Sequence, residues 1–142
     1  MENNMLLKFK SLSENESFAR SVVSCFALRL NPSLAEISDI KTAVSEAVTN
    51  CIVHGYSNTV GEIEIECSAK ENLLHINVFD FGVGIEDIDK ALEPFFSTKF
   101  QEERSGMGFT IMKSFMDEVK VESQKGVGTK VYMVKKIKTD KE

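Results

Sequence analysis

The longest helical pattern in the chain lies between Ser33 and Gly55, and it constrains the fold more than any other feature. Ser33 and Glu36 have the spacing of a capping box, in which each side chain binds the other residue's backbone amide, so the helix is predicted to begin there. Gly55 is predicted to end it. Its apolar residues recur three or four positions apart, which predicts a helix packed on a core; they are Ile37, Ile40, Val44, Ala47, Val48, Cys51 and Ile52.

A strand and a shorter helix are predicted before this pattern. Residues 6–9 are apolar enough for an opening strand, and a second capping spacing, Ser13 with Glu16, predicts a helix that Asn31-Pro32 stops. Its apolar stripe is expected to lie on the core; the stripe contains Phe18, Val22, Cys25, Phe26 and Arg29.

Alternating apolar and polar residues predict two hairpins later in the chain. Residues 62–66 and 74–78 alternate on either side of a polar turn, and residues 119–121 and 130–134 flank a turn at Lys125-Gly126. Between the hairpins, residues 80–104 are irregular and residues 106–116 return to helical spacing. The order of elements predicts one α+β domain over residues 1–142. It should contain a mixed, mostly antiparallel sheet with helices on one face.

Composition narrows the class of protein. A hydrophobic fraction of 42% and a charged fraction of 27% are typical of a globular domain. No apolar run approaches the roughly 20 residues of a membrane span, and the start lacks the apolar region of a signal peptide, so we expect a cytoplasmic protein without a membrane partner. The net charge of -5 argues against a nucleic-acid partner. Cys25, Cys51 and Cys67 are widely spaced in apolar sequence, which favours reduced core thiols over disulfides or a zinc site.

A polar ridge on the long helix is the first candidate for chemistry. Glu46, Asn50 and His54 are spaced four apart, so their side chains lie on one side of the helix. The ridge faces either a ligand groove or solvent, and a solvated helix face is the simpler interpretation when the helix is taken alone. His54 is interpreted as structural, because it lies in the last turn before Gly55.

Two glycine-containing motifs are further candidates. Asp80, Gly82 and Gly84 follow a strand directly, where glycines let backbone approach a ligand and a carboxylate can accept a hydrogen bond from an exocyclic amine. The alternative is a glycine-rich turn. Residues 104–109 place glycines at the start of a helix, where free amides and the helix dipole favour phosphate. The alternative there is an N-cap by Ser105 with glycines for packing.

Taken in order, these motifs resemble those of the GHKL ATPase and kinase superfamily. They are Glu46-Ala47-Val48-Thr49-Asn50 with His54-Gly55, Asp80-Phe81-Gly82-Val83-Gly84, and Ser105-Gly106-Met107-Gly108-Phe109. Within the superfamily, residues 94–99 and 103–105 are similar to the anti-sigma F family of sporulation serine kinases. The resemblance covers essentially the whole chain, from Glu14 to Thr129. It implies a Bergerat-type ATP-binding sandwich with a lid over residues 94–105.

The resemblance also implies roles for individual residues. Glu46 would be the catalytic general base toward an incoming hydroxyl, and Asn50 would coordinate the Mg²⁺ that bridges the phosphates of ATP. Asp80 would accept the adenine amino group. Three residues would lie beside the base: Gly82, Gly84 and Thr129. The other implied ATP contacts belong to the lid and the start of the next helix: Thr98, Lys99, Arg104, Ser105, Gly106, Met107, Gly108 and Phe109.

The implied function has two linked activities. The ATP-bound protein would sequester a sporulation sigma factor, and it would phosphorylate a serine of an anti-anti-sigma protein. Arg20 is predicted to contact a protein partner, the alternative being a surface ion pair with Glu16. A homodimer is expected from the resemblance alone. The alternative function is a binding module that holds nucleotide without transferring phosphate; Glu46 favours the kinase, because a pure binder needs no carboxylate next to a metal ligand.

Overall fold

The computed structural model describes residues 2–85, 87–88, 92 and 108–138 of the chain. The predicted lid at residues 94–105 lies outside these ranges. None of the helices within them is long and apolar enough to cross a membrane. In chain order, the elements are β1 (Asn3–Lys10), α1 (Asn15–Ala27), the 3₁₀ turn η1 (Leu28–Leu30), α2 (Leu34–Asn50), the π-helical turn η2 (Cys51–Gly55), β2 (Glu62–Lys70), β3 (Leu73–Asp80), α4 (Gly108–Phe115), β4 (Glu118–Gln124) and β5 (Gly128–Lys136).

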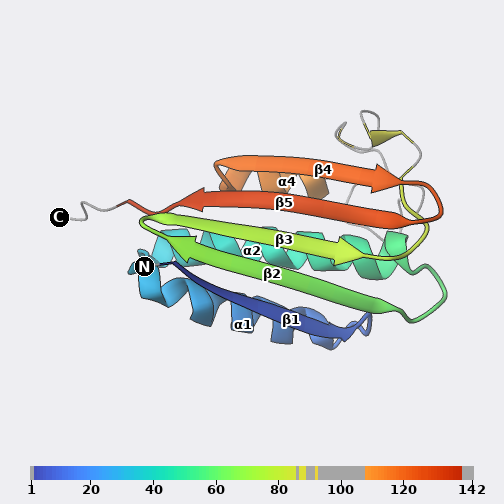
Figure 1. The fold of residues 1–142 in the computed structure, drawn as a ribbon, viewed down its shortest axis with the longest axis horizontal. Coiled ribbons are helices and arrows are strands. Elements are labelled where there is room, and N and C mark those ends of the chain that lie inside the picture. The colour runs from blue at the N-terminus through green and yellow to red at the C-terminus, as the bar shows by residue number, and fades with distance from the viewer. Residues whose placement is uncertain (1, 86, 89–91, 93–107, 139–142) are drawn as a thin grey trace.

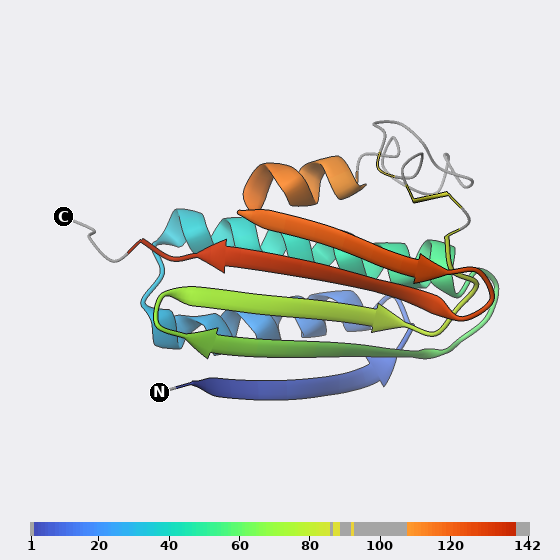
Figure 2. The same ribbon diagram turned by 45° about the horizontal axis from the view of Figure 1, so that its top comes forward.

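The described elements form two layers, a sheet and a layer of helices. The strands lie in the order β1-β2-β3-β5-β4, and every neighbouring pair is antiparallel. Figures 1 and 2 show the helices on one face of this sheet, and α2 packs against both α1 and α4. The predicted α+β fold, with a mostly antiparallel sheet and helices on one face, is confirmed. No parallel strand pair occurs in the part of the chain that the structure describes.

The core lies between the two layers, and the long helix is formed as predicted. The Ser33 hydroxyl accepts a hydrogen bond from the Glu36 N–H at 3.1 Å, and the Glu36 carboxylate accepts one from the Ser33 N–H at 2.8 Å. This reciprocal pair is the predicted capping box. Alternate residues of β2 and β3 and one stripe of α2 are buried against each other: Ile63, Ile65, Cys67, Leu74, Ile76, Val78, Ile40, Val44, Ala47 and Val48.

The predictions for the first helix are partly wrong. Its N-cap is Glu14, one residue later than a Ser13–Glu16 capping box requires, and no side chain caps it. The buried face is also different, because Phe18 is 48% exposed and Cys25 is exposed. Small residues let a helix lie close to its neighbours, and two alanines lie on the face that packs; its residues are Ala19, Val23, Phe26 and Ala27. Cys25 is therefore not a core thiol, whereas Cys51 and Cys67 are buried and free as expected.

Candidate functional site

The ends of four elements meet toward one end of the molecule (Figure 1). Here η2 ends, β3 ends at Asp80, β5 begins and α4 begins. Sheet register pairs Asp80 with Thr129 of the neighbouring strand. The Val83 N–H also donates a hydrogen bond to the Gly55 carbonyl at 3.1 Å, which joins the segment after β3 to the end of η2. The residues predicted to bind adenine are therefore neighbours in space.

Asp80 is a buried carboxylate with several protein donors. It is 6% exposed, and its Oδ1 accepts a hydrogen bond from the Gly82 N–H at 3.0 Å. The Cys51 thiol and the Thr129 N–H also donate to it. Burial raises the pKa of Asp80, and these donors counteract part of that rise. A carboxylate can accept about four hydrogen bonds, so three protein donors leave a position for the amine of a ligand.

The glycines after Asp80 are required by contacts within the protein. A Cβ on Gly82 would lie 1.9 Å from the Gly55 carbonyl oxygen. Gly84 has φ +77°, and a Cβ there would lie 2.2 Å from the Gln124 carbonyl oxygen. Both positions therefore need glycine even without a ligand. That they also let the adenine base approach stays a prediction.

Two hydroxyl side chains that were not predicted as site residues hold the segment after β3. The Phe81 N–H donates to the Tyr56 hydroxyl at 2.6 Å. The Ser123 hydroxyl accepts from the Ile85 N–H at 2.7 Å and forms a hydrogen bond with the Thr129 hydroxyl at 2.8 Å. Ser123 lies in no motif, so only the pairing of β4 with β5 brings it to the site. Tyr56 directly follows Gly55, and this proximity is the one signal that could have suggested it.

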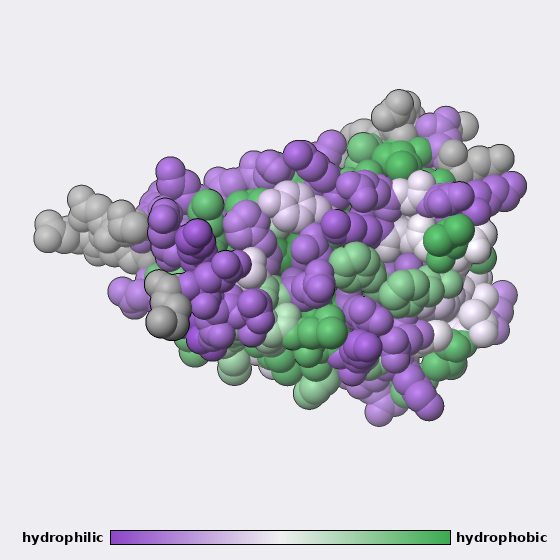
Figure 3. All heavy atoms as spheres, viewed as in Figure 1, coloured by the Kyte–Doolittle hydropathy of each residue, from purple (hydrophilic) through white to green (hydrophobic). Residues whose placement is uncertain are grey.

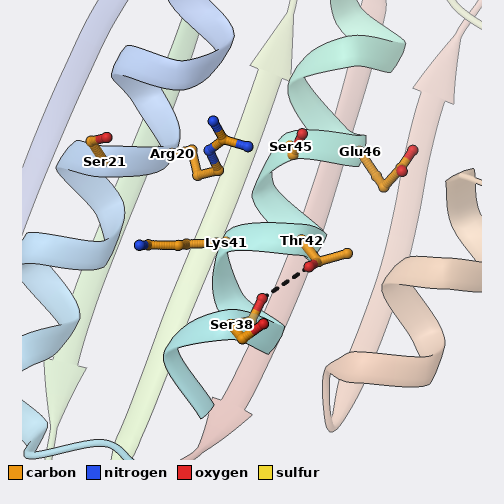
Figure 4. A pocket seen from close by; sticks show the side chains of 7 residues that line it. All are labelled: Arg20, Ser21, Ser38, Lys41, Thr42, Ser45 and Glu46. Carbon is orange, nitrogen blue, oxygen red and sulfur yellow. Dashed lines mark hydrogen bonds between the residues drawn. The ribbon is translucent and has the colours of Figure 1, made fainter. Parts of the chain in front are cut away.

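The last turns of α2 form the second half of the candidate site. Glu46 is 5% exposed, and Figure 4 shows its side chain projecting from α2 on the side away from Arg20. One turn later, the Asn50 side-chain oxygen is buried and has no hydrogen-bond partner in the part of the chain that the structure describes. The helix α4 packs against α2. Its first residue, Gly108, is buried, and Phe109 packs against the core.

A polar groove runs between α1 and α2 (Figure 4). It has a volume of about 450 Å³ and is lined by Arg20, Ser21, Ser38, Lys41, Thr42, Ser45 and Glu46. The Nε atom of Arg20 lies 3.6 Å from the Glu16 carboxylate, so the surface ion pair is present as well. Arg20, predicted to contact a partner, and Glu46, predicted to be the base, both line this groove, and the Glu46 carboxylate projects from the side of α2 away from Arg20.

Six of the predicted ATP-binding residues lie outside the described part of the chain. These are Thr98, Lys99, Arg104, Ser105, Gly106 and Met107. Their contacts stay predictions. Of the predicted site residues that the structure describes, Asp80, Gly82, Gly84 and Thr129 lie together at the end of the sheet, and Glu46 and Asn50 lie on the last turns of α2.

Similarity to known proteins decides the family. Residues 9–135 match the histidine kinase-like ATPase domain. An anti-sigma F factor from Thermoanaerobacter sp. is 58% identical over 139 residues, covering 98% of this chain and 97% of that protein. Those from Clostridium acetobutylicum and Geobacillus kaustophilus are 57% identical over 136 residues and 52% identical over 142 residues. They cover 96% and 99% of this chain, and 95% and 97% of their own lengths.

The chain belongs to the anti-sigma F factor family. Its histidine kinase-like ATPase domain spans both halves of the site described above. The resemblance inferred from the motifs is thereby confirmed, and with it the ATP-binding fold and an activity of the kinase type.

The donor set in this member of the anti-sigma F family fits a magnesium ion. Mg²⁺ prefers oxygen ligands, and it usually binds one or two protein groups together with substrate phosphates and water. The Asn50 side-chain oxygen is a group of this kind; it is buried and lacks a hydrogen-bond partner among the described residues. Within the described residues, no three His, Cys, Asp or Glu side chains come together to hold an ion. A single protein ligand beside a triphosphate is consistent with both observations.

Proposed function

We propose that this chain is an anti-sigma factor and an ATP-dependent protein-serine kinase. With ATP bound it sequesters a sporulation sigma factor, sigma F, and it phosphorylates a serine of an anti-anti-sigma protein. One observation carries the proposal. The buried Asn50 oxygen has no hydrogen-bond partner within the described residues, and it lies one helical turn after the buried Glu46 carboxylate. This pair suits a metal-bound phosphate next to an attacking hydroxyl.

The base of ATP binds at the end of the sheet. Asp80 accepts a hydrogen bond from the adenine amino group, and Thr129 lies beside it because the register pairs these two residues. Gly82 and Gly84 keep the segment after β3 close to its neighbours. These contacts bind and orient the nucleotide and take no part in the chemical step.

Phosphoryl transfer takes place beside α2. The serine oxygen of the acceptor forms a bond to the γ-phosphorus, and the bond from that phosphorus to the β,γ-bridging oxygen breaks, which releases ADP. Glu46 takes the proton of the serine hydroxyl. Asn50 would hold Mg²⁺, which would supply positive charge to neutralise the phosphates. Backbone amides at the start of α4, next to Gly108, donate to the phosphates together with Arg104.

The polar groove between α1 and α2 is the surface on which we propose that a protein partner binds. It contains the cationic side chains of Arg20 and Lys41, several hydroxyls, and Glu46. We place the acceptor protein here, with Arg20 in contact with it. We also propose a cytoplasmic homodimer formed through β1 and α1, where Leu6 and Phe18 are exposed.

The direct test is a transfer experiment with purified components. The protein is incubated with Mg²⁺, γ-labelled ATP and an anti-anti-sigma protein, and the modified residue is identified by mass spectrometry. We expect label on a serine. Retention of sigma F with ATP, but without any labelled acceptor, would instead support the non-catalytic binding module.

Charge reversal tests the partner surface. Arg20→Glu should weaken binding of the acceptor protein or of sigma F while ATP affinity is retained. Lys70→Glu is the matched control, because Lys70 is exposed at the end of β2 and does not line the groove. If Arg20→Glu binds both partners with unchanged affinity, Arg20 contacts neither of them, and its role is limited to the surface ion pair with Glu16.

A further inference from the structure

A buried thiol lies against the carboxylate proposed to bind adenine. Cys51 is the first residue of η2, it is 3% exposed, and its thiol donates a hydrogen bond to Asp80. From the sequence alone it is a core cysteine without a role. The phosphoryl-transfer mechanism does not use it either. The contact places Cys51 next to the part of the site that recognises the base.

The turn η2 packs against β3, the strand that ends at Asp80. The Tyr56 N–H donates to the Cys51 carbonyl at 2.9 Å, which closes a turn of five residues, Cys51–Gly55. Gly55, at the other end of the turn, also lies against Asp80, since a Cβ there would be 2.8 Å from the carboxyl group. Turns of this kind occur frequently at functional sites. Gly55 leaves room for the carboxylate, and Cys51 donates to it.

Among the described residues, three donors hold the Asp80 carboxylate, and one of the three is a side chain. The Gly82 and Thr129 donors are backbone N–H groups, which a substitution does not remove, whereas the Cys51 donor is a thiol. A buried carboxylate needs such donors to remain ionised. Their directions also decide which lone pair is left for a ligand. Removal of the thiol should therefore change both the orientation of Asp80 and its strength as an acceptor.

We propose that Cys51 is a positioning residue for nucleotide recognition, which orients the Asp80 carboxylate toward the exocyclic amine of the purine base. This inference rests on the proposed function, in which Asp80 accepts that amine. Cys51 acts through Asp80 and needs no contact with the nucleotide. It therefore contributes to the preference for a purine that carries a 6-amino group over one that lacks it.

The test compares two nucleotides on a set of full-length proteins. ATP and purine riboside triphosphate, which lacks the 6-amino group, are titrated by calorimetry in the presence of Mg²⁺. Cys51→Ala should weaken ATP binding by about three- to tenfold, the effect of one hydrogen bond, and leave the affinity for the analogue within about twofold. Cys51→Ser keeps a donor and should retain most of the preference for ATP.

Two further variants control for folding and packing. Cys51→Val also removes the donor but adds apolar volume where Cys51→Ala leaves space, so it replaces Cys51→Ala if the alanine protein does not fold. Cys67→Ala is the matched control, because Cys67 is an equally buried thiol on β2 that pairs with Ile76, whereas Asp80 pairs with Ile63 at the other end of the strand. Its ratio of ATP to analogue affinity should equal that of the wild type.

Asp80→Asn separates failure of the inference from failure of the proposed site. If this variant leaves the ratio of affinities unchanged, the adenine contact is wrong, and the role of Cys51 falls with it. If it removes the preference for ATP while Cys51→Ala and Cys51→Val keep it, only the role of Cys51 is overturned. Equal weakening of both nucleotides by Cys51→Ala would likewise overturn it, since that result assigns the thiol to packing.

Discussion

The two halves of the site differ in how their polar groups are satisfied. At the end of the sheet, the Asp80 carboxylate accepts hydrogen bonds from Gly82, Cys51 and Thr129. On α2, the Asn50 side-chain oxygen is buried and has no hydrogen-bond partner among the described residues. Buried polar atoms are rarely left unpaired in folded proteins. Within the described residues, the carboxylate of the first half therefore has protein partners, whereas the Asn50 oxygen of the second half has none.

From this difference we infer that the two halves have separate roles, recognition of the base at the end of the sheet and metal-dependent chemistry on α2. A preformed acceptor at the end of the sheet loses little freedom when a base binds, so it suits recognition. An unpaired oxygen on α2 gains most when a metal-bound phosphate arrives, since the cost of leaving it unpaired is then removed. Substitutions near Asp80 should change nucleotide affinity. Substitutions on α2 should change turnover or the dependence on Mg²⁺.

The largest effect is expected for Glu46→Gln, which keeps size and hydrogen bonding but removes the proposed base. The rate of phosphoryl transfer to the acceptor should fall by roughly a hundredfold to ten-thousandfold. ATP binding and retention of sigma F should survive, because occupancy by ATP sets that state. The rate is measured from single-turnover transfer of labelled phosphate, and ATP affinity by calorimetry.

Glu66→Gln is the control for this comparison, since Glu66 is an exposed glutamate on β2 and is not one of the proposed site residues. It should transfer phosphate at the wild-type rate. A wild-type rate in Glu46→Gln would show that the base lies elsewhere. Loss of ATP binding in Glu46→Gln would contradict the proposal that recognition and chemistry belong to separate halves of the site.

The next largest effect is expected for Asp80→Asn. Loss of a hydrogen bond to a charged acceptor should weaken ATP binding by about 1.5 to 3 kcal/mol. Transfer at saturating ATP should change less than in Glu46→Gln, because Asp80 is proposed to bind the base and not the reacting atoms. Calorimetric titration gives the affinity. An affinity equal to that of the wild type would remove Asp80 from the site.

The pH dependence of ATP affinity tests the same carboxylate without a substitution. Burial raises the pKa of Asp80, so its ionised form is lost at a higher pH than for an exposed aspartate. A protonated carboxyl group is a weaker acceptor for the adenine amine. Wild-type affinity should therefore fall as pH is lowered through this raised pKa. The ratio of wild-type to Asp80→Asn affinity should shrink over the same range, and a constant ratio would contradict the assignment.

Gly82→Ala tests whether glycine is needed at this position for stability of the fold or for binding of ATP. The added Cβ would meet the Gly55 carbonyl, so the free energy of unfolding should fall by about 1 to 3 kcal/mol in urea denaturation. Gly126→Ala is the comparison, because a Cβ at Gly126 meets no atom within 4 Å. Its cost should be limited to the left-handed backbone, about 1 kcal/mol. Full stability with lost ATP binding in Gly82→Ala would assign the glycine to the ligand.

The smallest effect is expected at the far end of the helix that carries Glu46 and Asn50. Ser33→Ala removes the capping box and should lower the free energy of unfolding by about 1 kcal/mol, with ATP affinity unchanged. Ser13→Ala is the control, since no side chain caps α1. It should alter stability by less than about 0.5 kcal/mol. Equal losses in the two variants would contradict the different caps of the two helices.

These caps also show which parts of the fold were predictable. Ser33 and Glu36 precede a long apolar period, so local spacing and packing agree on where α2 begins. Ser13 and Glu16 have the same spacing, yet α1 begins one residue later. Its buried face was mispredicted because hydropathy favours the larger Phe18 over small residues. The choice between these faces depends on packing against α2, which no local pattern contains.

The candidate site was predictable where a motif carries it and not where pairing creates it. Asp80 and Asn50 lie in glycine-rich or helical motifs whose geometry follows from local sequence. Ser123 reaches Ile85 only after β4 and β5 pair and the segment after β3 turns back. Cys51 meets Asp80 only after η2 packs against β3. Contacts of this kind depend on tertiary structure, so they could not be predicted from spacing.

The affinity of Asn50→Ala for ATP, measured with Mg²⁺ and with excess EDTA, tests the division of labour most directly. Asn50 is proposed to act only through the metal ion, as an oxygen ligand to a hard cation. The variant should therefore lose most of the gain in affinity that Mg²⁺ gives the wild type, and bind ATP in EDTA as the wild type does. Asp80→Asn should weaken both affinities equally. An equal loss with and without Mg²⁺ in Asn50→Ala would contradict the account.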